Sequence, residues 1–301
     1  MPELPEVETV RRGLSRLIEG LVVTGVTHDN PKSFPNAPAD VQNFLIGAEI
    51  VTVTRRAKVL LVELSTKYSL IIHLKMTGQL VYRNAKNSEQ NFGAGHPNDS
   101  LIGELPDRST RVTLTLGNGA NLYFNDQRKF GWVRLVPTAE IPMIDFFKRV
   151  GPEPLSDDFT WEIMRDRLAR RKNTNIKAAL LDQSVIAGVG NIYADESLWG
   201  AHLHPTTLVK DVSEDQIQAL YKALRDVLQL SIDKGGSTDQ HYVDAEGQRG
   251  KYLTFANVFR REGLPCPRCG TIIEKSRVAG RGTHTCPVCQ PIGVSKPASK
   301  K

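Results

Sequence analysis

RVTLTLGNGANLYF, residues 111–124, places an alternating strand pattern directly before the dipeptide Asn118-Gly119. Alternation of apolar and polar side chains is typical of a strand with one buried face, and Asn-Gly is a preferred turn of tight β-hairpins. Strand-like runs surround this hairpin, at residues 21–28, 49–56, 58–64, 69–75 and 131–136. The pattern predicts about six to eight strands, mainly antiparallel and packed as a sandwich or a barrel.

The first twenty residues follow a helical period instead. Apolar side chains recur there at spacings of three and four, which places them on one face of a helix; they are Val7, Val10, Leu14 and Leu17. Acidic residues near the start complement the positive end of the helix dipole, and Gly20 can end the helix. A helix does not explain why Pro2 and Glu3 stand together at the chain end, where fraying is normal.

The second half of the chain is predicted to be helical. The helix-like segments are 161–171, 176–183, 191–199 and 214–233. Prolines between residues 137 and 155 mark a domain boundary, and Gly235-Gly236 ends the longest helix. The polar stretch 84–110 predicts a long surface loop, and the Pro-, Ser- and Lys-rich tail 291–301 is expected to be disordered.

The composition is that of a globular protein large enough for two ordinary domains. Of its 301 residues 40% are hydrophobic and 24% are charged. No apolar run reaches the about 18 residues of a membrane span, and no secretory signal peptide is visible, so we expect an intracellular protein. The net charge of +6 permits a nucleic-acid face without demanding one.

All four cysteines lie in two short motifs near the end of the chain. Cys266 and Cys269 belong to CPRCG, and Cys286 and Cys289 belong to CPVCQ, with sixteen residues between Cys269 and Cys286. Two such turns can supply a tetrahedral shell of four thiolates, whereas disulfides are disfavoured in a reducing cell interior. The sequence therefore predicts one structural zinc ion, which leaves no open position for catalysis.

The segment between these motifs is basic. It reads EKSRVAGRGTHT and carries Lys275, Arg277, Arg281 and His284. A basic loop on a zinc-held hairpin can bind phosphate, but a solvated run of charges is an equally good interpretation of the charge alone.

Three motifs occur in one order: MPELPEVETV, AGVGNIYADE at 187–196 and the cysteine pairs. In this combination the chain resembles the formamidopyrimidine-DNA glycosylase (Fpg, MutM) family over roughly residues 2–290. The resemblance implies an α+β multidomain fold: an N-terminal catalytic β-sandwich domain with a long N-terminal helix (2–136) and a helix–two-turn–helix DNA-binding domain (151–235). A lesion-recognition loop region (236–255) and a C-terminal zinc finger (256–290) complete it, and the resemblance does not cover the predicted disordered basic tail (291–301).

The resemblance gives the opening residues a chemical role. Removal of Met1 leaves Pro2 with a free secondary amine, and α-amino groups have a pKa of about 7.7–8, well below the ~10.4 of lysine. In the family this amine attacks C1′ of the damaged nucleotide and forms a Schiff base. The chain is thus expected to be a bifunctional DNA glycosylase and AP lyase of base excision repair. It would remove 8-oxoguanine and formamidopyrimidines and cut the strand by β,δ-elimination.

The family's other site residues carry over by position. The catalytic set becomes Pro2, Glu3, Lys58 and Arg281, with Glu3 as general acid–base and Glu6 as a support; Glu6 also suits the start of a helix. The implied DNA contacts are His73, Met76, Arg128, Phe130, Lys177 and Asn191. Met76, Arg128 and Phe130 match the residues that fill the gap left by a flipped nucleotide. Taken singly, Met76 and Phe130 are more often core residues, His73 a satisfied sheet histidine and Asn191 a helix N-cap.

Two rival classes stay open at this point. An endonuclease VIII-like relative shares Pro2-Glu3 and the finger but acts on oxidised pyrimidines, and a non-catalytic zinc-ribbon protein explains the cysteines and the charge but not Pro2-Glu3. Asp239 and Gln240 depart from the family's usual hydrophobic and basic pair, which bears on base preference. The implied partner is double-stranded DNA with oxidised bases or abasic sites, bound by a monomer in the cytoplasm at the nucleoid, without a membrane.

Overall fold

The computed structural model describes residues 2–96, 98–236 and 252–292. The chain divides into two compact units: Met1–Arg149 with Ser231–Leu253, and Val150–Leu230 with Thr254–Lys301. Most of the predicted lesion-recognition region (237–251) and most of the predicted tail (293–301) lie outside the described residues.

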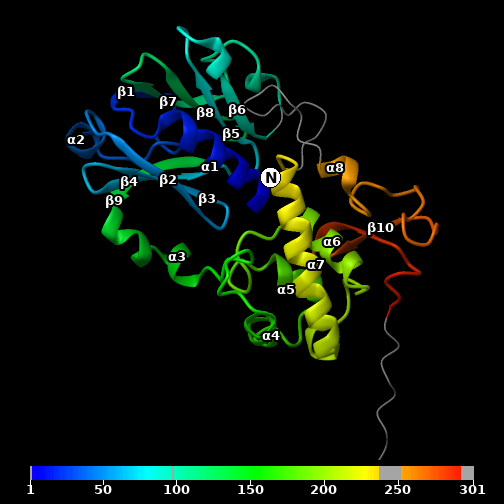
Figure 1. Cartoon of the computed structure of the whole chain (residues 1–301). Coiled ribbons are helices and arrows are strands. Elements are labelled where there is room, and N and C mark those ends of the chain that lie inside the picture. Colours follow the sequence, from blue (N-terminus) through cyan, green and yellow to red (C-terminus); the bar gives the residue numbers. More distant parts are fainter. Residues whose placement is uncertain (1, 97, 237–251, 293–301) are drawn as a thin grey trace, which may run out of the picture. The chain divides into compact units, whose positions relative to one another are not determined.

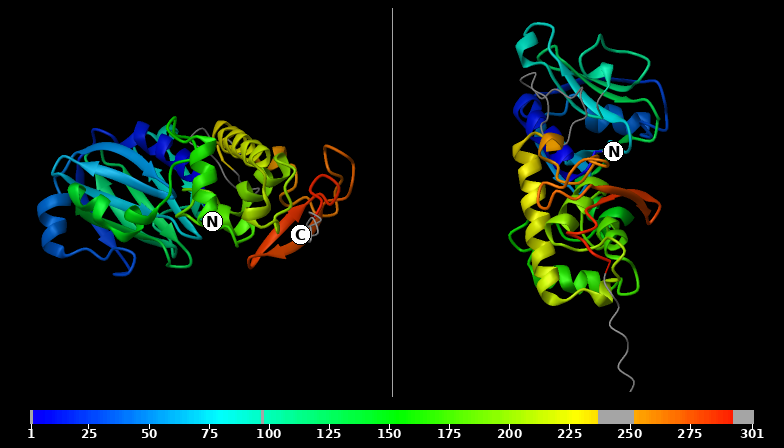
Figure 2. Two further views of the ribbon diagram at one scale, coloured as in Figure 1. Left: turned by 90° about the horizontal axis from the view of Figure 1, so that it is seen from below. Right: turned by 90° about the vertical axis from the view of Figure 1, so that its right-hand side faces the viewer.

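The first unit contains one long helix and two antiparallel sheets, which form two layers (Figures 1 and 2). Its helix and strands are α1 (Leu4–Ile18), β1 (Val23–His28), β2 (Ile50–Arg56), β3 (Val59–Leu64), β4 (Tyr68–His73), β5 (Gly78–Arg83), β6 (Phe92–Gly95), β7 (Thr110–Leu116), β8 (Asn121–Asp126) and β9 (Trp132–Pro137). Its shorter helical turns are α2 (Pro38–Asp40), η1 (Val41–Leu45), η2 (Ser88–Gln90), η3 (Asp99–Leu101), η4 (Thr138–Met143) and α3 (Asp145–Arg149).

The strand orders are β1-β7-β8-β5-β6 in one sheet and β2-β3-β4-β9 in the other. The predicted hairpin joins β7 to β8, with Leu114 opposite Leu122 and Gly119 at a φ of 84°. A positive φ at this turn is what the Asn-Gly signal anticipates. The sheets share one hydrophobic core with the apolar face of α1, whose Val10 and Leu14 are fully buried. The sandwich is therefore confirmed and the barrel is not.

The stretch 84–110 corrects the prediction of a surface loop. Part of it forms β6, which pairs with β5, and Phe92 on that strand is buried in the core. The ring of Phe92 lies so close to α1 that a Cβ at Gly13 would stand 2.3 Å from it. The polar composition hid a short edge strand, because four residues with two glycines give almost no alternation signal.

The second unit is mainly helical. Its elements are α4 (Trp161–Ala169), α5 (Ile176–Leu181), α6 (Asn191–Gly200), η5 (Val209–Asp211), most of α7 (Glu214–Asp233), the second half of α8 (Tyr252–Phe255), β10 (Glu274–Val278) and β11 (Arg281–Thr285). The long helix α7 buries its predicted stripe, including Leu220, Leu224 and Leu228, and ends before Gly235-Gly236, both at positive φ. The four helices expected in this half of the chain are therefore present.

The β10–β11 hairpin belongs to the same unit as these helices. Val258 and Ile273 pack with the cysteines against Trp199 of α6, and Gln290 donates a hydrogen bond to the carbonyl of Leu203. The finger has little apolar core of its own, so it is stabilised by this helix and by metal binding. In the described ranges no helix is both long enough and apolar enough to cross a membrane.

Candidate functional site

The first candidate residues lie at the start of α1. Pro2 and Glu3 are both buried, and Glu3 is the N-cap of the helix. The backbone N–H of Glu3 donates to Oε2 of Glu6 at 2.8 Å as part of a capping box. Through this one hydrogen bond, Glu6 both caps the start of the helix and holds the backbone of Glu3 in place. Gly236, at the edge of the predicted lesion-recognition region, lies beside Glu6.

An arginine connects α1 to the turn that carries Lys58. Arg55 donates to Oε2 of Glu8 at 3.2 Å and to the carbonyl of Ala57 at 2.9 Å. Lys58 follows that carbonyl and is only 7% exposed. A nearly buried lysine at a strand end is not the exposed cation of an ordinary turn.

His73 lies beside this lysine because β3 and β4 pair with Val59 opposite His73. Its Nδ1 accepts the backbone N–H of Lys75 at 3.1 Å. Burial, together with the charges of Lys75 and Lys58, lowers the pKa of His73 to about 3. The imidazole is therefore neutral, with Nε2 as its N–H donor.

Met76, Arg128 and Phe130 occupy two neighbouring turns. Met76 is 37% exposed and Phe130 is 53% exposed, so neither is a core residue. The guanidinium of Arg128 lies over the ring of Phe130, 4.8 Å from its centroid. An exposed aromatic, a planar cation and a flexible apolar side chain are the chemical types that can enter a base stack.

Three residues beside the candidate side chains adopt left-handed backbone. Ala57, Lys75 and Lys129 adopt φ values of 53°, 50° and 57°. Left-handed backbone costs a residue with a Cβ roughly 1–2 kcal/mol. The three positions adjoin Lys58, Met76 and the pair Arg128 and Phe130. Left-handed backbone also occurs away from these side chains, at Lys67, His202, Arg260 and Ala279.

Arg281, Asn191 and Lys177 belong to the second unit. Arg281 is exposed at the start of β11. The N-cap of α6 is Gly190, so Asn191 is not the cap; its Nδ2 donates to the carbonyl of Gly282 at 2.9 Å. Asn191 thereby holds the residue that follows Arg281.

Lys177 has no exposed surface, which contradicts a direct contact with DNA. Its ammonium donates to Oδ1 of Asp195 at 2.6 Å, to the hydroxyl of Thr283 at 2.7 Å and to the carbonyl of Gly282 at 3.0 Å. A buried ammonium requires such acceptors because leaving water is costly. Sequence spacing could not reveal this, since Asp195 and Gly282 lie far along the chain.

Two acids of α6 that the sequence analysis missed organise this region. Asp195 accepts the backbone N–H of His284 at 3.0 Å as well as the lysine. Glu196 is 2% exposed and accepts the backbone N–H groups of Asn257, Val258 and Phe259 at 2.8–2.9 Å. The only signal in the sequence is two adjacent acids on a helix whose other positions are apolar or small.

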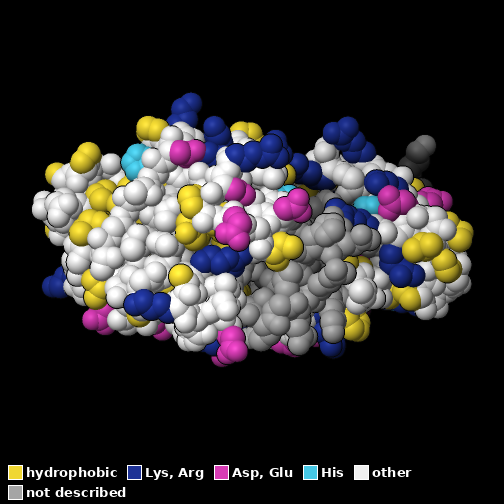
Figure 3. Space-filling model, turned by 90° about the horizontal axis from the view of Figure 1, so that it is seen from above, with side chains coloured by type: hydrophobic (Ala, Val, Ile, Leu, Met, Phe, Trp, Pro, Cys, Tyr) yellow, Lys and Arg dark blue, Asp and Glu magenta, His cyan; other side chains and the backbone are white. Residues whose placement is uncertain are grey.

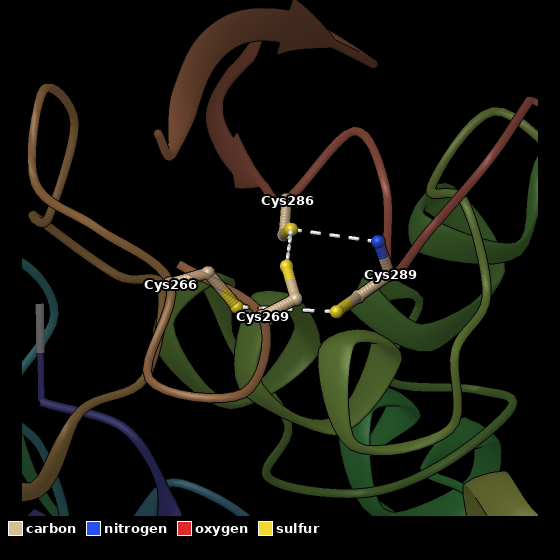
Figure 4. Close-up of side chains that lie close together, drawn as sticks. All are labelled: Cys266, Cys269, Cys286 and Cys289. Carbon is tan, nitrogen blue, oxygen red and sulfur yellow. Dashed lines mark hydrogen bonds between the residues drawn. The ribbon is translucent and has the colours of Figure 1, made fainter. Parts of the chain in front are cut away.

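The four cysteines converge on one point (Figure 4), with their sulfur atoms within 4.8 Å of one another. A tetrahedral shell with Zn–S bonds of about 2.3 Å requires sulfur separations of about 3.8 Å. The sulfurs of Cys266 and Cys289 are 3.9 Å apart, and those of Cys269 and Cys286 are 3.4 Å apart. The group fits zinc and leaves no fifth ligand among the described residues.

The protonation of the cysteines also suits a cation. Hydrogen bonds with Thr271 lower the pKa of Cys269 to about 6, while burial raises that of Cys289 to about 12. The charge of a bound metal ion would favour loss of the proton from each of these thiols.

The surface agrees with the modest net charge. On the face drawn in Figure 3, Lys and Arg side chains are interspersed with Asp and Glu rather than forming one continuous patch.

Three family models match this chain. They are the formamidopyrimidine-DNA glycosylase N-terminal domain at residues 1–133, the formamidopyrimidine-DNA glycosylase H2TH domain at 150–242 and the zinc finger found in FPG and IleRS at 263–292. These matches, with the sandwich and the four-cysteine centre, define the class: a zinc-finger DNA glycosylase of DNA repair.

Individual relatives identify the family within this class. A formamidopyrimidine-DNA glycosylase of Pelotomaculum thermopropionicum is 42% identical over 97% of this chain and 100% of its own. A point mutant of the Lactococcus lactis FPG, in complex with Fapy-dG containing DNA, superposes with a TM-score of 0.84 at 34% identity, covering 97% and 100% of the two chains. The L. lactis Fpg bound to abasic-site DNA gives 0.84 at 33%, covering 96% and 100%. The chain belongs to the formamidopyrimidine-DNA glycosylase family.

Proposed function

We propose that this chain removes oxidised purines, 8-oxoguanine and formamidopyrimidines, from duplex DNA and then cuts the strand as an AP lyase. The observation that carries the proposal is the corner at the start of α1, where Pro2 is buried and the backbone of the adjoining Glu3 is held by Glu6. A helix start alone requires no such constraint on the second and third residues of the chain.

The first step makes Pro2 the nucleophile. With Met1 removed, the uncharged amine attacks C1′, forms the N–C1′ bond and loses its proton while the bond from C1′ to the base breaks. The base departs with that electron pair and takes up a proton. Glu3 then donates a proton to the ring oxygen as the C1′–O4′ bond opens, which leaves an iminium ion on C1′.

The second step cuts the strand. The iminium withdraws electrons from C2′, so a proton leaves C2′ and the 3′ phosphate is expelled by β-elimination; the 5′ phosphate follows by δ-elimination. We assign Lys58 and Arg281 to the catalytic set as phosphate-facing cations that stabilise these leaving groups. The near burial of Lys58 beside neutral His73 supports its role.

The DNA contacts follow from the same geometry. His73 donates from Nε2 to a phosphate without carrying charge, and Asn191 and Arg281 flank Gly282, where they can hold a phosphate together. We reassign Lys177 to the support of Arg281, because its ammonium is fully buried. We further propose that the protein acts as a monomer on nucleoid DNA in the cytoplasm. The segment 237–251, which the sequence singled out for reading the base, lies outside the described residues.

Borohydride trapping tests the chemistry. The full chain is incubated with an 8-oxoguanine:cytosine duplex and sodium borohydride, and the adduct is located by mass spectrometry. We expect the sugar on the nitrogen of Pro2, and no adduct from a variant with extra residues before Pro2. An adduct elsewhere, or a working protein that retains Met1, contradicts the mechanism. Faster excision of an oxidised pyrimidine in a parallel assay contradicts the purine assignment.

A further inference from the structure

A buried carboxylate stands behind the exposed side chains of the two turns. Asp126 ends β8 and has no exposed surface. Its Oδ2 accepts the backbone N–H of Gly131 at 2.7 Å, and its Oδ1 accepts that of Arg128 at 3.2 Å. A single side chain thus fixes both ends of the turn that presents Arg128 and Phe130.

The same carboxylate reaches the turn of Met76. Pairing of β5 with β8 places Gly78 opposite Asp126, and the hydroxyl of the preceding residue, Thr77, donates to Oδ1 of Asp126. The Thr77 oxygen in turn accepts the backbone N–H of Arg128 at 3.1 Å. Residues 49 positions apart in sequence are therefore joined by a closed set of hydrogen bonds.

The fit around this set is tight. A Cβ at Gly131 would lie 2.6 Å from the ring of Phe124 and 2.8 Å from the carbonyl of His73. Thr77 is itself buried, although its neighbour Met76 is exposed. The exposed side chains therefore project from turns whose backbones are fixed from beneath.

We propose that Thr77 and Asp126 are positioning residues that lock the two turns into one rigid wedge, so that Met76, Arg128 and Phe130 enter the duplex together. The inference rests on the proposed function, which makes those three side chains the ones that replace a flipped nucleotide. Turns ordered before contact with DNA lose less conformational freedom on insertion than separately mobile turns do.

The test compares Thr77→Val with Thr77→Ser. Valine keeps the volume and removes the hydroxyl, whereas serine keeps the hydroxyl. Base extrusion is followed by stopped-flow fluorescence of 2-aminopurine placed beside 8-oxoguanine in a duplex. Thr24→Val is the matched control, because it removes the hydroxyl of an exposed strand threonine.

We expect Thr77→Val to slow extrusion by about tenfold to a hundredfold, the effect of losing a hydrogen bond to a charged group. Thr77→Ser and Thr24→Val should keep the wild-type rate. Adding Thr77→Val to Met76→Ala should slow extrusion by less than Thr77→Val does in the wild type, because the two changes act on one wedge. Borohydride trapping on a duplex with a preformed abasic site should fall less than extrusion.

Three outcomes overturn the proposal: extrusion by Thr77→Val at the wild-type rate, equal slowing by Thr77→Ser, or an equal loss of extrusion and trapping. The last indicates a general structural role. If Thr77→Val fails to fold, the extrusion rate of Thr77→Ser and the melting temperatures of the variants decide between a positioning role and a general structural role. Failure of the wild-type protein to form any Pro2 adduct would count against the proposed function instead.

Discussion

Two buried aspartates, one in each unit, stand behind an exposed arginine and are satisfied in different ways. Asp126 lies behind Arg128 and accepts only neutral donors, a hydroxyl and two backbone N–H groups. Asp195 acts on Arg281 through Lys177 and the carbonyl of Gly282, and its partner is a buried ammonium.

The two aspartates differ in whether their support comes from backbone geometry or from a charged partner. Backbone N–H donors are fixed by the strands around them, so Asp126 depends on the fold alone. Asp195 is paired with the buried ammonium of Lys177, and a buried ion pair loses far more when one partner is removed than when both are. The sandwich unit thus orders its turns with neutral donors, and the helical unit orders its hairpin with a charge pair.

The largest effect should come from breaking the buried pair. Lys177→Met leaves Asp195 without its cation, and we expect it to lower the free energy of unfolding of the second unit by about 3–5 kcal/mol. Lys177→Met combined with Asp195→Asn should recover most of this loss. Urea unfolding followed by circular dichroism gives both values.

Lys222→Met is the matched control for that pair, because Lys222 and Asp226 form a salt bridge with both side chains largely exposed. It should change stability by less than about 1 kcal/mol. Equal losses of unfolding free energy in Lys177→Met and Lys222→Met would show that the buried pair contributes no more to stability than the exposed pair does.

Asp126→Asn should have a smaller effect, a loss of about 1–3 kcal/mol in the first unit. The amide would turn an N–H group toward donors that now meet carboxylate oxygens, so one of the backbone N–H groups loses its acceptor. The same urea titration measures it. A loss larger than that of Lys177→Met would reverse the proposed contrast between the two aspartates.

The two arginines should differ in their dependence on salt. If Arg281 meets phosphate, Arg281→Gln lowers the slope of log K against log salt by about one. Arg128→Gln should weaken binding to lesion duplex with a nearly unchanged slope, because Arg128 is expected to face an unpaired base. Fluorescence anisotropy from about 50 to about 200 mM salt tests both. Equal slopes for the two variants would show that Arg281 and Arg128 do not differ in their contact with phosphate.

The smallest effect concerns His73, the neutral histidine of the first unit. Its folded pKa of about 3 lies below the unfolded value of 6.5, so its contribution is complete above pH 6.5 and is lost as pH falls toward 3. From pH 6.5 to 5.5 the wild type should lose about 1 kcal/mol that His73→Gln does not lose. Parallel pH profiles for the two proteins would mean that His73 titrates normally.

Local patterns predicted much of this molecule. The α1 period, the Asn118-Gly119 hairpin and the cysteine spacing each depend on residues near one another in sequence, and each is confirmed. The strand β6 was missed because its composition carries no alternation.

The supports behind the site could not be predicted in the same way. The contact of Thr77 with Asp126 depends on the register of β5 against β8, and the burial of Lys177 depends on β11 folding over α6. Neither leaves a short-range pattern. The roles of Pro2, Glu3 and the exposed side chains came from the family resemblance, and they stay predictions until the adduct is located.

The approach of Phe92 to Gly13 gives a structural role to the stretch 84–110. Position 13 lies on α1, the helix that Glu3 caps and Pro2 precedes, and it can accept no side chain beyond hydrogen while that ring is in place. The aromatic ring therefore restricts rotation and translation of the helix against the sheet. A residue remote in sequence from α1 thus helps to fix the position of that helix against the sheet.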